Sequence, residues 1–358
     1  MKNTTNVDYL IVGQGIAGST LAWEILKCNR QILVIDNHHV DSSSIAAGGN
    51  VNPVTGKRFV KSWKIEELLP EVNSMYGEME KEFGVQIWES RSNVRILHSE
   101  EQEKEWLTRA KLWGEFFGDT LDKPLLKSVF NNAAGAAEIT GGGRVNMQLI
   151  LKSIAEILSN KGLLRRTKFD FNNLTVNQDS IEYQEEDEII CANRIIFCEG
   201  WQAIHNPYFN YLPFQLSKGE ALIVRFLGEY PVAHRIVNND LTITEIAEGC
   251  YWVGATNVFN DISTKPTKIG LDELLSRLAL SVKIPFEVIE QRACVRPTVK
   301  DRLPLLGQHP DFAPLYIFNG LGTKGASLAP MLSRQLVNYL ENGVPLDYES
   351  SISRFTFK

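Results

Sequence analysis

Residues 9–18, with the sequence YLIVGQGIAG, decide the fold of this chain. The four apolar residues before Gly13 have the composition of a strand, and a helical pattern of apolar residues begins at Ile16. A second apolar run, Ile32–Ile35, ends at Asp36. Uninterrupted apolar strands that flank a short helix are typical of a parallel βαβ unit, because such strands are buried on both faces. The sequence therefore predicts an α/β fold that begins with this unit.

Gly13, Gly15 and Gly18 match the pattern GxGxxG between a predicted strand and a predicted helix. The first glycine permits a tight turn, the second allows a pyrophosphate to approach the backbone, and the third lets the helix pack on the strand. The helix N-terminus at Ile16 and Ala17 supplies unpaired N–H groups and a positive dipole. This context indicates dinucleotide binding, with a purely structural glycine turn as the alternative.

Further segments bear on the cofactor. Asp36 ends the second strand, where an acidic side chain can accept hydrogen bonds from a ribose. Residues 42–50 (SSSIAAGGN) are nearly free of bulk, so that backbone N–H groups can approach a flat ring; a flexible surface loop is the alternative. Residues 292–307 (RACVRPTVKDRLPLLG) form a second block. In residues 320–330 (GLGTKGASLAP), glycines open a helix whose dipole points at an electron-rich group.

Composition and charge exclude several classes of protein. The chain has 358 residues, a net charge of −6 and 44% hydrophobic residues, as in a globular protein of about two domains. The negative charge argues against broad nucleic-acid binding, which needs a basic face. The chain contains no run of about 20 apolar residues, so no transmembrane helix is predicted, and no signal peptide is visible.

The five cysteines form no CxxC pair and the histidines no HExxH motif, so we expect no metal site. An odd number of cysteines without a secretion signal indicates reduced thiols and a cytoplasmic protein.

The order of elements predicts a discontinuous domain arrangement. A β-rich stretch, residues 216–296, separates the early βαβ unit from a late strand, glycine turn and helix. We expect one domain from residues 1–85, 143–212 and 299–358, and a second from residues 86–142 and 213–298. The predicted helices span about residues 16–26, 64–83, 100–117, 146–160, 270–282 and 326–341.

Taken in order, these motifs resemble those of the D-amino-acid oxidase-like flavoproteins, which include glycine oxidase, sarcosine oxidase and D-amino-acid dehydrogenase. Residues 213–224 (PFQLSKGEALIV) and 251–256 (YWVGAT) also resemble glycine oxidase segments, so nearly the whole chain takes part. The glycine-rich block at residues 320–330 looks most like the corresponding segment in the flavin domain of the bifunctional tRNA-modification enzyme that removes a carboxymethyl group from wobble uridine.

The resemblance implies a glycine oxidase-like fold: a Rossmann-type FAD-binding domain with an inserted, mostly antiparallel β-sheet substrate domain. It also implies FAD as the cofactor and a set of residues around it. Gly13, Gly15 and Gly18 would hold the pyrophosphate and Asp36 the adenosine ribose. The remaining cofactor contacts would come from Ser43, Ser44, Ala47, Gly48 and Gly49 along the pyrophosphate-to-flavin stretch, from Gly200, and from Gly322, Thr323, Lys324 and Gly325 at the pyrimidine edge.

The implied reaction is oxidation of the C–N bond of a carboxylate-bearing amine: a D-amino acid, glycine or an N-substituted glycine. The α-hydrogen would leave as hydride to flavin N5, and water would hydrolyse the imine. Arg296 would receive the carboxylate, with a domain-bridging salt bridge as the alternative role. Lys324 would stabilise charge on N1 and O2 of the reduced flavin. Where glycine oxidase places a tyrosine near the substrate, Thr242 stands here, which puts glycine itself in doubt.

Cys294 raises the question whether the flavin is attached covalently. In sarcosine oxidase, a cysteine seven residues before the aspartate that matches Asp301 holds the flavin covalently, and Cys294 has that spacing. Glycine oxidase has no cysteine there, and a buried cysteine is a common small apolar filler. We therefore expect non-covalent FAD.

Two other functions stay open: a tRNA wobble-uridine carboxymethyl oxidase, and a flavin-binding subunit of a larger dehydrogenase. A cluster of basic and aromatic residues follows the small-residue loop at residues 42–50, and it could bind an anionic partner. The interpretation we favour is a solvated segment that leads into the next helix. The cluster consists of Lys57, Arg58, Phe59, Lys61, Trp63 and Lys64. Trp106 and Trp113 are expected in the core, and Glu185–Glu188 in a solvated turn.

Overall fold

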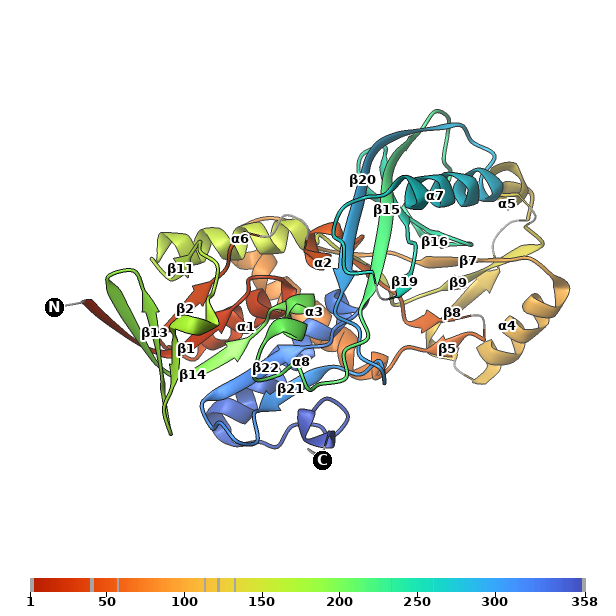
Figure 1. The fold of residues 1–358 in the computed structure, drawn as a ribbon. Coiled ribbons are helices and arrows are strands. Elements are labelled where there is room, and N and C mark those ends of the chain that lie inside the picture. Colours follow the sequence, from red (N-terminus) through yellow and green to blue (C-terminus); the bar gives the residue numbers. More distant parts are fainter. Residues whose placement is uncertain are drawn as a thin grey trace.

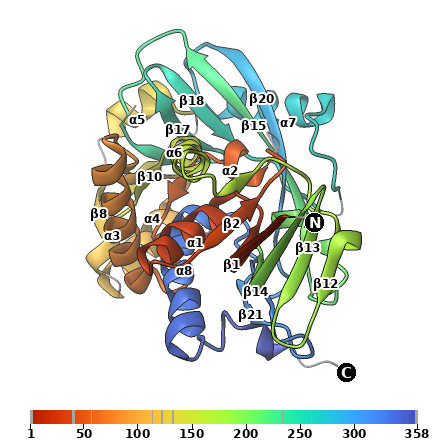
Figure 2. The same ribbon diagram turned by 90° about the vertical axis from the view of Figure 1, so that its left-hand side faces the viewer.

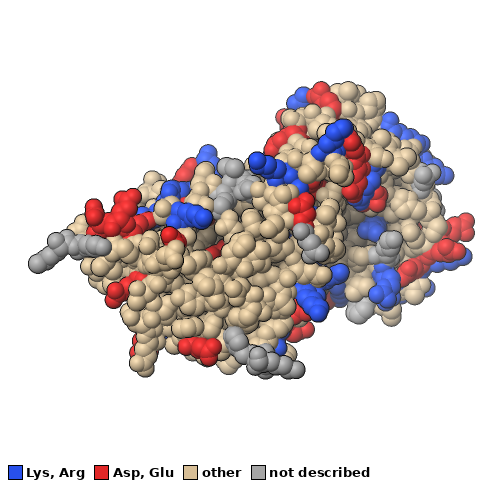
Figure 3. All heavy atoms as spheres, in the orientation of Figure 1, with Lys and Arg blue, Asp and Glu red and all other residues tan. Residues whose placement is uncertain are grey.

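A computed structural model describes the chain as two lobes, each built on one large sheet (Figure 1). The described residues are 3–38, 42–56, 58–112, 114–120, 123–131, 133–232, 234–259 and 261–355. Figure 3 shows charged side chains gathered on the lobe that carries β15, β20 and α7, whereas the face over β14, β21 and β22 is largely uncharged. None of the described helices is long and apolar enough to cross a membrane.

The first sheet brings together strands from the start, middle and end of the chain. Its parallel centre consists of β2 (Ile32–Ile35), β1 (Asn3–Val12), β14 (Glu188–Phe197) and β22 (Leu315–Asn319). Leu10 of β1 is paired with Leu33 and Ile195, and Phe197 with Ile317. The carboxyl ends of these strands therefore meet at one edge. The sheet also includes β11 (Leu164–Arg165), β12 (Leu174–Val176), β13 (Ile181–Glu185) and β21 (Leu305–Gln308), which makes eight strands in the described residues.

Helices cover one face of this sheet (Figure 2), and side chains from connecting segments, such as Phe169 and Phe209, pack on the other. The helices are α1 (Ile16–Lys27), α3 (Ile65–Phe83), α6 (Met147–Asn160) and α8 (Gly325–Asn342). Buried apolar side chains of all four, such as Leu21 and Leu332, pack against Ile11 and Val34. On the opposite face Phe169 stacks on Tyr183 of β13, with ring centroids 4.5 Å apart.

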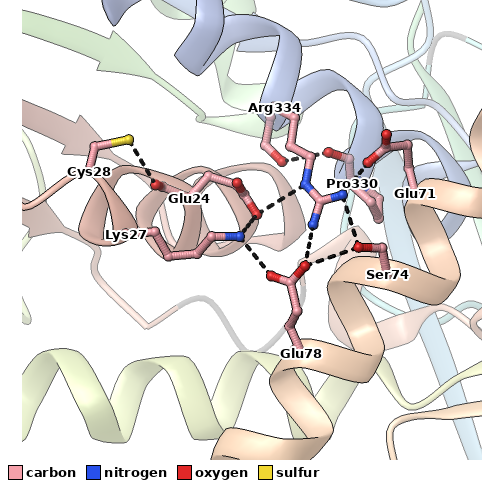
Figure 4. Close-up of polar contacts among 9 residues, drawn as sticks. Glu24, Lys27, Cys28, Glu71, Ser74, Glu78, Pro330 and Arg334 are labelled. Atoms are coloured by element: carbon pink, nitrogen blue, oxygen red, sulfur yellow. Dashed lines mark hydrogen bonds and ion pairs between the residues drawn. The ribbon is translucent and has the colours of Figure 1, made fainter.

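An ion-pair network ties three of these helices together (Figure 4). Arg334 of α8 binds Glu24 of α1 at 3.4 Å and Glu78 of α3 at 2.7 Å, and it also contacts Glu71. Lys27 joins Glu24 and Glu78 at 2.8 and 2.7 Å. Because several charges share partners, the network holds α1 and α8 in register more firmly than isolated surface pairs do. Both helices begin at the edge where the parallel strands end.

The second sheet has nine strands within the described residues, all antiparallel to their neighbours except β16 and β7. They are β15 (Ser217–Phe226), β16 (Ile236–Asn238), β17 (Thr242–Ala247), β18 (Cys250–Gly254), β19 (Val258–Phe259), β20 (Phe286–Arg296), β7 (Asn93–Leu97), β8 (Phe117–Thr120) and β9 (Gly135–Ile139). One face packs on α5 (Lys123–Val129) and α7 (Lys268–Ser281) through Val224, Val253 and Leu274. The opposite face of β15, β18 and β20 looks toward the first lobe (Figure 1).

The remaining elements lie outside the two large sheets, and two of them differ from the expectations. They are α2 (Ser43–Ala46), β3 (Asn50–Val51), β4 (Val54–Thr55), β5 (Val60–Lys61), β6 (Trp88–Ser90), α4 (Glu100–Leu112), β10 (Gly143–Val145) and the 3-10 turns Gly114–Phe116, Phe171–Asn173, Gly200–His205 and Ile352–Arg354. The small-residue stretch expected as a loop contains the helical turn α2, because Ser42 accepts a hydrogen bond from Ile45 N–H at 3.3 Å and caps it. The helix expected over 100–117 ends at Leu112, and Phe117 begins β8.

Trp106 is 1% exposed, as expected of a core residue. Its companion Trp113, and Lys57 of the basic cluster, lie outside the described residues.

Candidate active site

A cavity of about 1950 Å³ runs between the two lobes. Its walls are the carboxyl ends of β1, β2, β14 and β22, the first turns of α1 and α8, and the inner faces of β15, β18 and β20. Every residue expected to contact cofactor or substrate lines it, apart from Gly18. These residues are Gly13, Gly15, Ile16, Ala17, Asp36, Ser43, Ser44, Ala47, Gly48, Gly49, Gly200, Arg296, Gly322, Thr323, Lys324 and Gly325.

Two glycines shape the turn between β1 and α1. Gly13 has φ +99°, and a Cβ there would lie 2.5 Å from the carbonyl oxygen of Cys198. A Cβ on Gly18 would lie 1.9 Å from the carbonyl oxygen of Gly13, so any side chain would push the helix off the strand. Gly18 therefore acts by helix packing, and it lies behind the cavity wall.

Asp36 is held at the cavity by three donors. Its Oδ2 accepts from Gln14 N–H at 2.8 Å, and its Oδ1 accepts from His38 N–H at 2.7 Å and from the Arg166 guanidinium at 3.3 Å. These bonds fix the orientation of the carboxylate and leave lone pairs for further donors. Sequence reasoning missed Arg166, which lies 130 residues away in the chain and carries no local motif.

The first turns of α1 and α8 lie against each other. A Cβ on Gly325 would lie 3.0 Å from the Ile16 side chain. At α1, Ser44 Oγ accepts a hydrogen bond from Ile16 N–H at 3.0 Å, and at α8 no side chain caps the helix. Two helix N-termini therefore direct positive dipole ends to this part of the cavity. Burial, and then the nearby charge of Arg302, lowers the pKa of Lys324.

Trp252 of β18 connects the second lobe to α2 and the residues after it, and sequence reasoning missed this contact. Its indole N–H donates to the Ala46 carbonyl at 2.9 Å, and a Cβ on Gly48 would lie 2.9 Å from its ring. The alternation of β18, with Tyr251 and Val253 in the core of the second lobe, is the signal that could have placed Trp252 on the cavity side.

Small residues on β15 make room for larger ones on β20. Ser217, Gly219 and Ala221 are paired with Arg296, Cys294 and Arg292, and all six line the cavity. A Cβ on Gly219 would lie 1.8 Å from an Arg296 guanidinium nitrogen, so that group lies directly over the glycine. Cys294 is a buried thiol that lies between the two arginines along β20.

The hydrogen-bond partners of Arg296 among the described residues are neutral. Its guanidinium donates to Asn257 Oδ1 at 3.3 Å and to the Thr256 carbonyl at 3.2 Å. No carboxylate among the described residues forms an ion pair with it, and burial lowers its pKa. Arg292, by contrast, binds Glu290 through two hydrogen bonds of 2.8 Å. Arg296 is partly buried, and a cation withdrawn from water without an anionic partner is costly, which points to an anionic ligand at Arg296.

Two more side chains complete the wall. Thr242 lines the cavity, and its hydroxyl donates to Asn238 Oδ1 at 3.0 Å. Glu199 follows β14 and accepts a hydrogen bond from the Asn206 amide at 2.8 Å. Burial raises the pKa of the Glu199 carboxyl to about 7.

The basic and aromatic cluster has partners of its own. Lys61 binds Glu66 and Glu115, each at 2.6 Å, and Lys64 contacts Asp347. Phe59 is 3% exposed and packs on Trp106. These two lysines are paired with carboxylates, and Phe59 belongs to the core rather than to a solvated segment.

The sequence from residue 8 to residue 339 matches the family described as FAD dependent oxidoreductase. The chain belongs to this family. The cavity fits the cofactor: Asp36 at one end, two helix N-termini and the loop after α2 provide acceptors and N–H groups along its length. The protein is therefore an FAD-dependent oxidoreductase of this fold, as expected from the sequence.

Relatives match nearly the whole chain. The uncharacterized oxidoreductase YurR of Bacillus subtilis (strain 168) is 26% identical, covering 92% of this chain and 93% of its own. The structure of glycine oxidase from Geobacillus kaustophilus superimposes with a TM-score of 0.79 at 20% identity, over 98% of this chain and 100% of that one. Iminodiacetate oxidase from Chelativorans sp. BNC1 gives a TM-score of 0.77 at 23% identity, over 96% and 99%. At these identities the structures establish the glycine oxidase-like fold.

Proposed function

We propose that the protein oxidises the C–N bond of an amine that carries a carboxylate. The observation that carries the proposal is Arg296, a partly buried guanidinium that lines the cavity and whose hydrogen-bond partners in the described part of the chain are neutral. Only arginine offers a planar fork that binds a carboxylate through two hydrogen bonds. Glycine oxidase and iminodiacetate oxidase, two proteins of the same fold, are named for substrates of this class.

The first lobe is the proposed FAD-binding domain, made of residues 1–85, 143–212 and 299–358. Asp36 would bind the adenosine ribose, and the first turn of α1 would bind the pyrophosphate through its N–H groups. Lys324 and the first turn of α8 would lie at the pyrimidine edge, where a cation and a helix dipole stabilise negative charge. When bound, FAD supplies the two-electron acceptor of the reaction. We expect it to be held without a covalent bond to Cys294.

The second lobe, residues 86–142 and 213–298, would form the substrate side. Arg296 would hold the carboxylate at a fixed place, so that the neighbouring C–N bond is presented to the cofactor in one orientation. The indole of Trp252 and the strand faces around Gly219 would exclude bulk water, which strengthens the charge interaction at Arg296. In this arrangement no protein base has to remove a proton from carbon.

A panel of substrates tests the proposal. The purified protein would be mixed without oxygen with D-amino acids, glycine, N-alkyl glycines and a tRNA that carries a carboxymethylaminomethyl uridine, and the loss of the oxidised flavin colour would be recorded. We expect reduction by at least one small carboxylate-bearing amine and none by amines of the same shape without the carboxylate. Reduction by the tRNA alone would replace this proposal with the tRNA-modification function. No reduction by any member would refute both.

A further inference from the structure

The cavity wall carries basic side chains beyond those that the proposed function uses. Strand β20, the turn after it and the start of α8 contribute Arg292, Arg296, Arg302 and Lys324, and the first lobe also contributes Lys152, Arg166 and Lys168. The acidic side chains in the described part of the wall are Asp36, Glu156, Asp170 and Glu199, which belong to the first-sheet edge and α6. Glu290 neutralises Arg292, and the proposed function uses Arg296 and Lys324. Arg302 is left over.

Arg302 is an exposed residue at the cavity wall, and it has no counter-ion among the described residues. No described residue forms an ion pair or a side-chain hydrogen bond with it. The neighbouring Asp301 is taken by Arg354, whose guanidinium donates to Asp301 Oδ2 at 2.9 Å. Asp301 Oδ1 also accepts from Leu303 N–H at 3.0 Å. The carboxylate next to Arg302 in sequence is therefore directed away from it.

The backbone of Arg302 is unusual as well. It has φ +62°, the left-handed conformation that costs a residue with a Cβ about 1–2 kcal/mol relative to glycine. Strained residues that persist at a cavity wall are a reason to look for a function. Here the turn, closed by a 2.9 Å bond from Arg302 N–H to the Val299 carbonyl, brings the side chain to the cavity beside Lys324. Figure 3 shows Lys and Arg side chains where the two lobes meet.

We propose that Arg302 receives a second anionic group of the substrate, so that the preferred substrate is an amine with two carboxylates. The inference rests on the proposed function, because it assigns the first carboxylate to Arg296. A dianionic amine would supply one negative charge to each of the two guanidinium groups that lack a carboxylate partner. The adjacent ammonium of Lys324 adds to the positive field that attracts such a substrate.

Binding of inhibitors that cannot be oxidised tests Arg302 without relying on turnover. Succinate and butyrate have the same chain length and differ in the second carboxylate. Their dissociation constants would be measured on the oxidised holoenzyme by calorimetry, at constant ionic strength. Wild type should bind succinate about fivefold to tenfold more tightly than butyrate, the order expected for one partly exposed charge-assisted contact. Arg302→Gln should remove this preference and leave butyrate binding unchanged.

Two further variants keep the test decisive. Lys300→Gln removes an exposed charge two residues away that does not line the cavity, and it should keep the succinate preference. Arg302→Gly removes the side chain while it relieves the left-handed backbone, so it should lose the preference without losing stability. Equal loss of preference in Lys300→Gln would show a general charge effect and overturn the proposal.

The outcomes separate this inference from the proposed function. Arg296→Met should weaken succinate and butyrate alike; if it weakens neither, the carboxylate role of Arg296 is wrong. If Arg296→Met weakens both and Arg302→Gln leaves their ratio unchanged, the proposed function stands and the second-carboxylate site is wrong. A lowered flavin reduction potential in Arg302→Gln with an unchanged ratio would assign Arg302 to the reduced flavin instead and would also overturn the inference.

Discussion

Replacement of Glu199 by glutamine should change how the stability of the protein depends on pH. Burial raises the pKa of this carboxyl from 4.5 to about 7 in the folded protein. Between these two values the folded state binds a proton more tightly than the unfolded state, so the free energy of unfolding falls as pH rises. Each unit of difference between the folded and unfolded pKa changes the free energy of unfolding by about 1.4 kcal/mol. Glu199 alone should therefore lower the free energy of unfolding by about 2 kcal/mol as the pH rises from 5 to 8.

Glu199→Gln keeps the shape and the acceptor for Asn206 but cannot ionise. Its stability relative to wild type should therefore be about 2 kcal/mol more favourable at pH 8 than at pH 5. Urea unfolding of both proteins at the two pH values measures this difference. Glu182→Gln, at an exposed carboxylate of β13, is the matched control and should show no such change. An equal difference between wild type and Glu199→Gln at both pH values would refute the argument that Glu199 is buried with a raised pKa.

Three other predictions follow from individual contacts. Gly18→Ala should lower the free energy of unfolding by about 3 kcal/mol or more, because its Cβ would lie 1.9 Å from a carbonyl oxygen. Gly77→Ala in α3, where a Cβ would meet no atom within 4 Å, should raise the free energy of unfolding by about 0.5–1 kcal/mol. Urea unfolding measures both. Acid precipitation should release the flavin into the supernatant; colour that stays with the pellet and moves to the supernatant in Cys294→Ala would demonstrate covalent attachment. Trp252→Phe loses the bond to the Ala46 carbonyl and should raise the dissociation constant of FAD about fivefold, measured by titration of apoprotein; unchanged affinity would separate Trp252 from the cofactor site.

The sequence patterns predicted those features of the fold that depend on residues close together in the chain. The turn at Gly13 and Gly18 needs glycine for steric reasons that lie within a few residues and the adjacent strand, so the motif was readable from the sequence. The strand pattern of β14 and β22 and the helix after Gly325 were also readable, because buried strands and amphipathic helices have distinct apolar periods. The carboxyl ends of those strands then had to meet at one edge.

Contacts between distant segments could not be predicted in the same way. The family resemblance distinguishes Arg296 from Arg292 in the same block, but the ion pair that neutralises Arg292 through Glu290 became visible only in the structure. Arg166 and Trp252 reach their partners from 130 and 206 residues away, and such pairings depend on how whole strands and lobes pack. The short helix α2 was missed because a serine side chain that accepts a backbone hydrogen bond, as Ser42 does from Ile45 N–H, can stabilise either a loop or a helix N-terminus.

Flavin reduction in Arg296→Met tests the central claim most directly. The rate of anaerobic flavin reduction would be measured at low substrate for wild type, Arg296→Lys and Arg296→Met, with a carboxylate-bearing amine and with its decarboxylated analogue. Arg296→Lys keeps the charge but loses the bidentate fork, so we expect a loss of roughly 10- to 150-fold for the carboxylate substrate. Arg296→Met should lose more, keep its FAD, and be relatively less impaired with the decarboxylated analogue. If Arg296→Met slows both substrates by the same factor, Arg296 does not bind the carboxylate and the proposed function loses its main support.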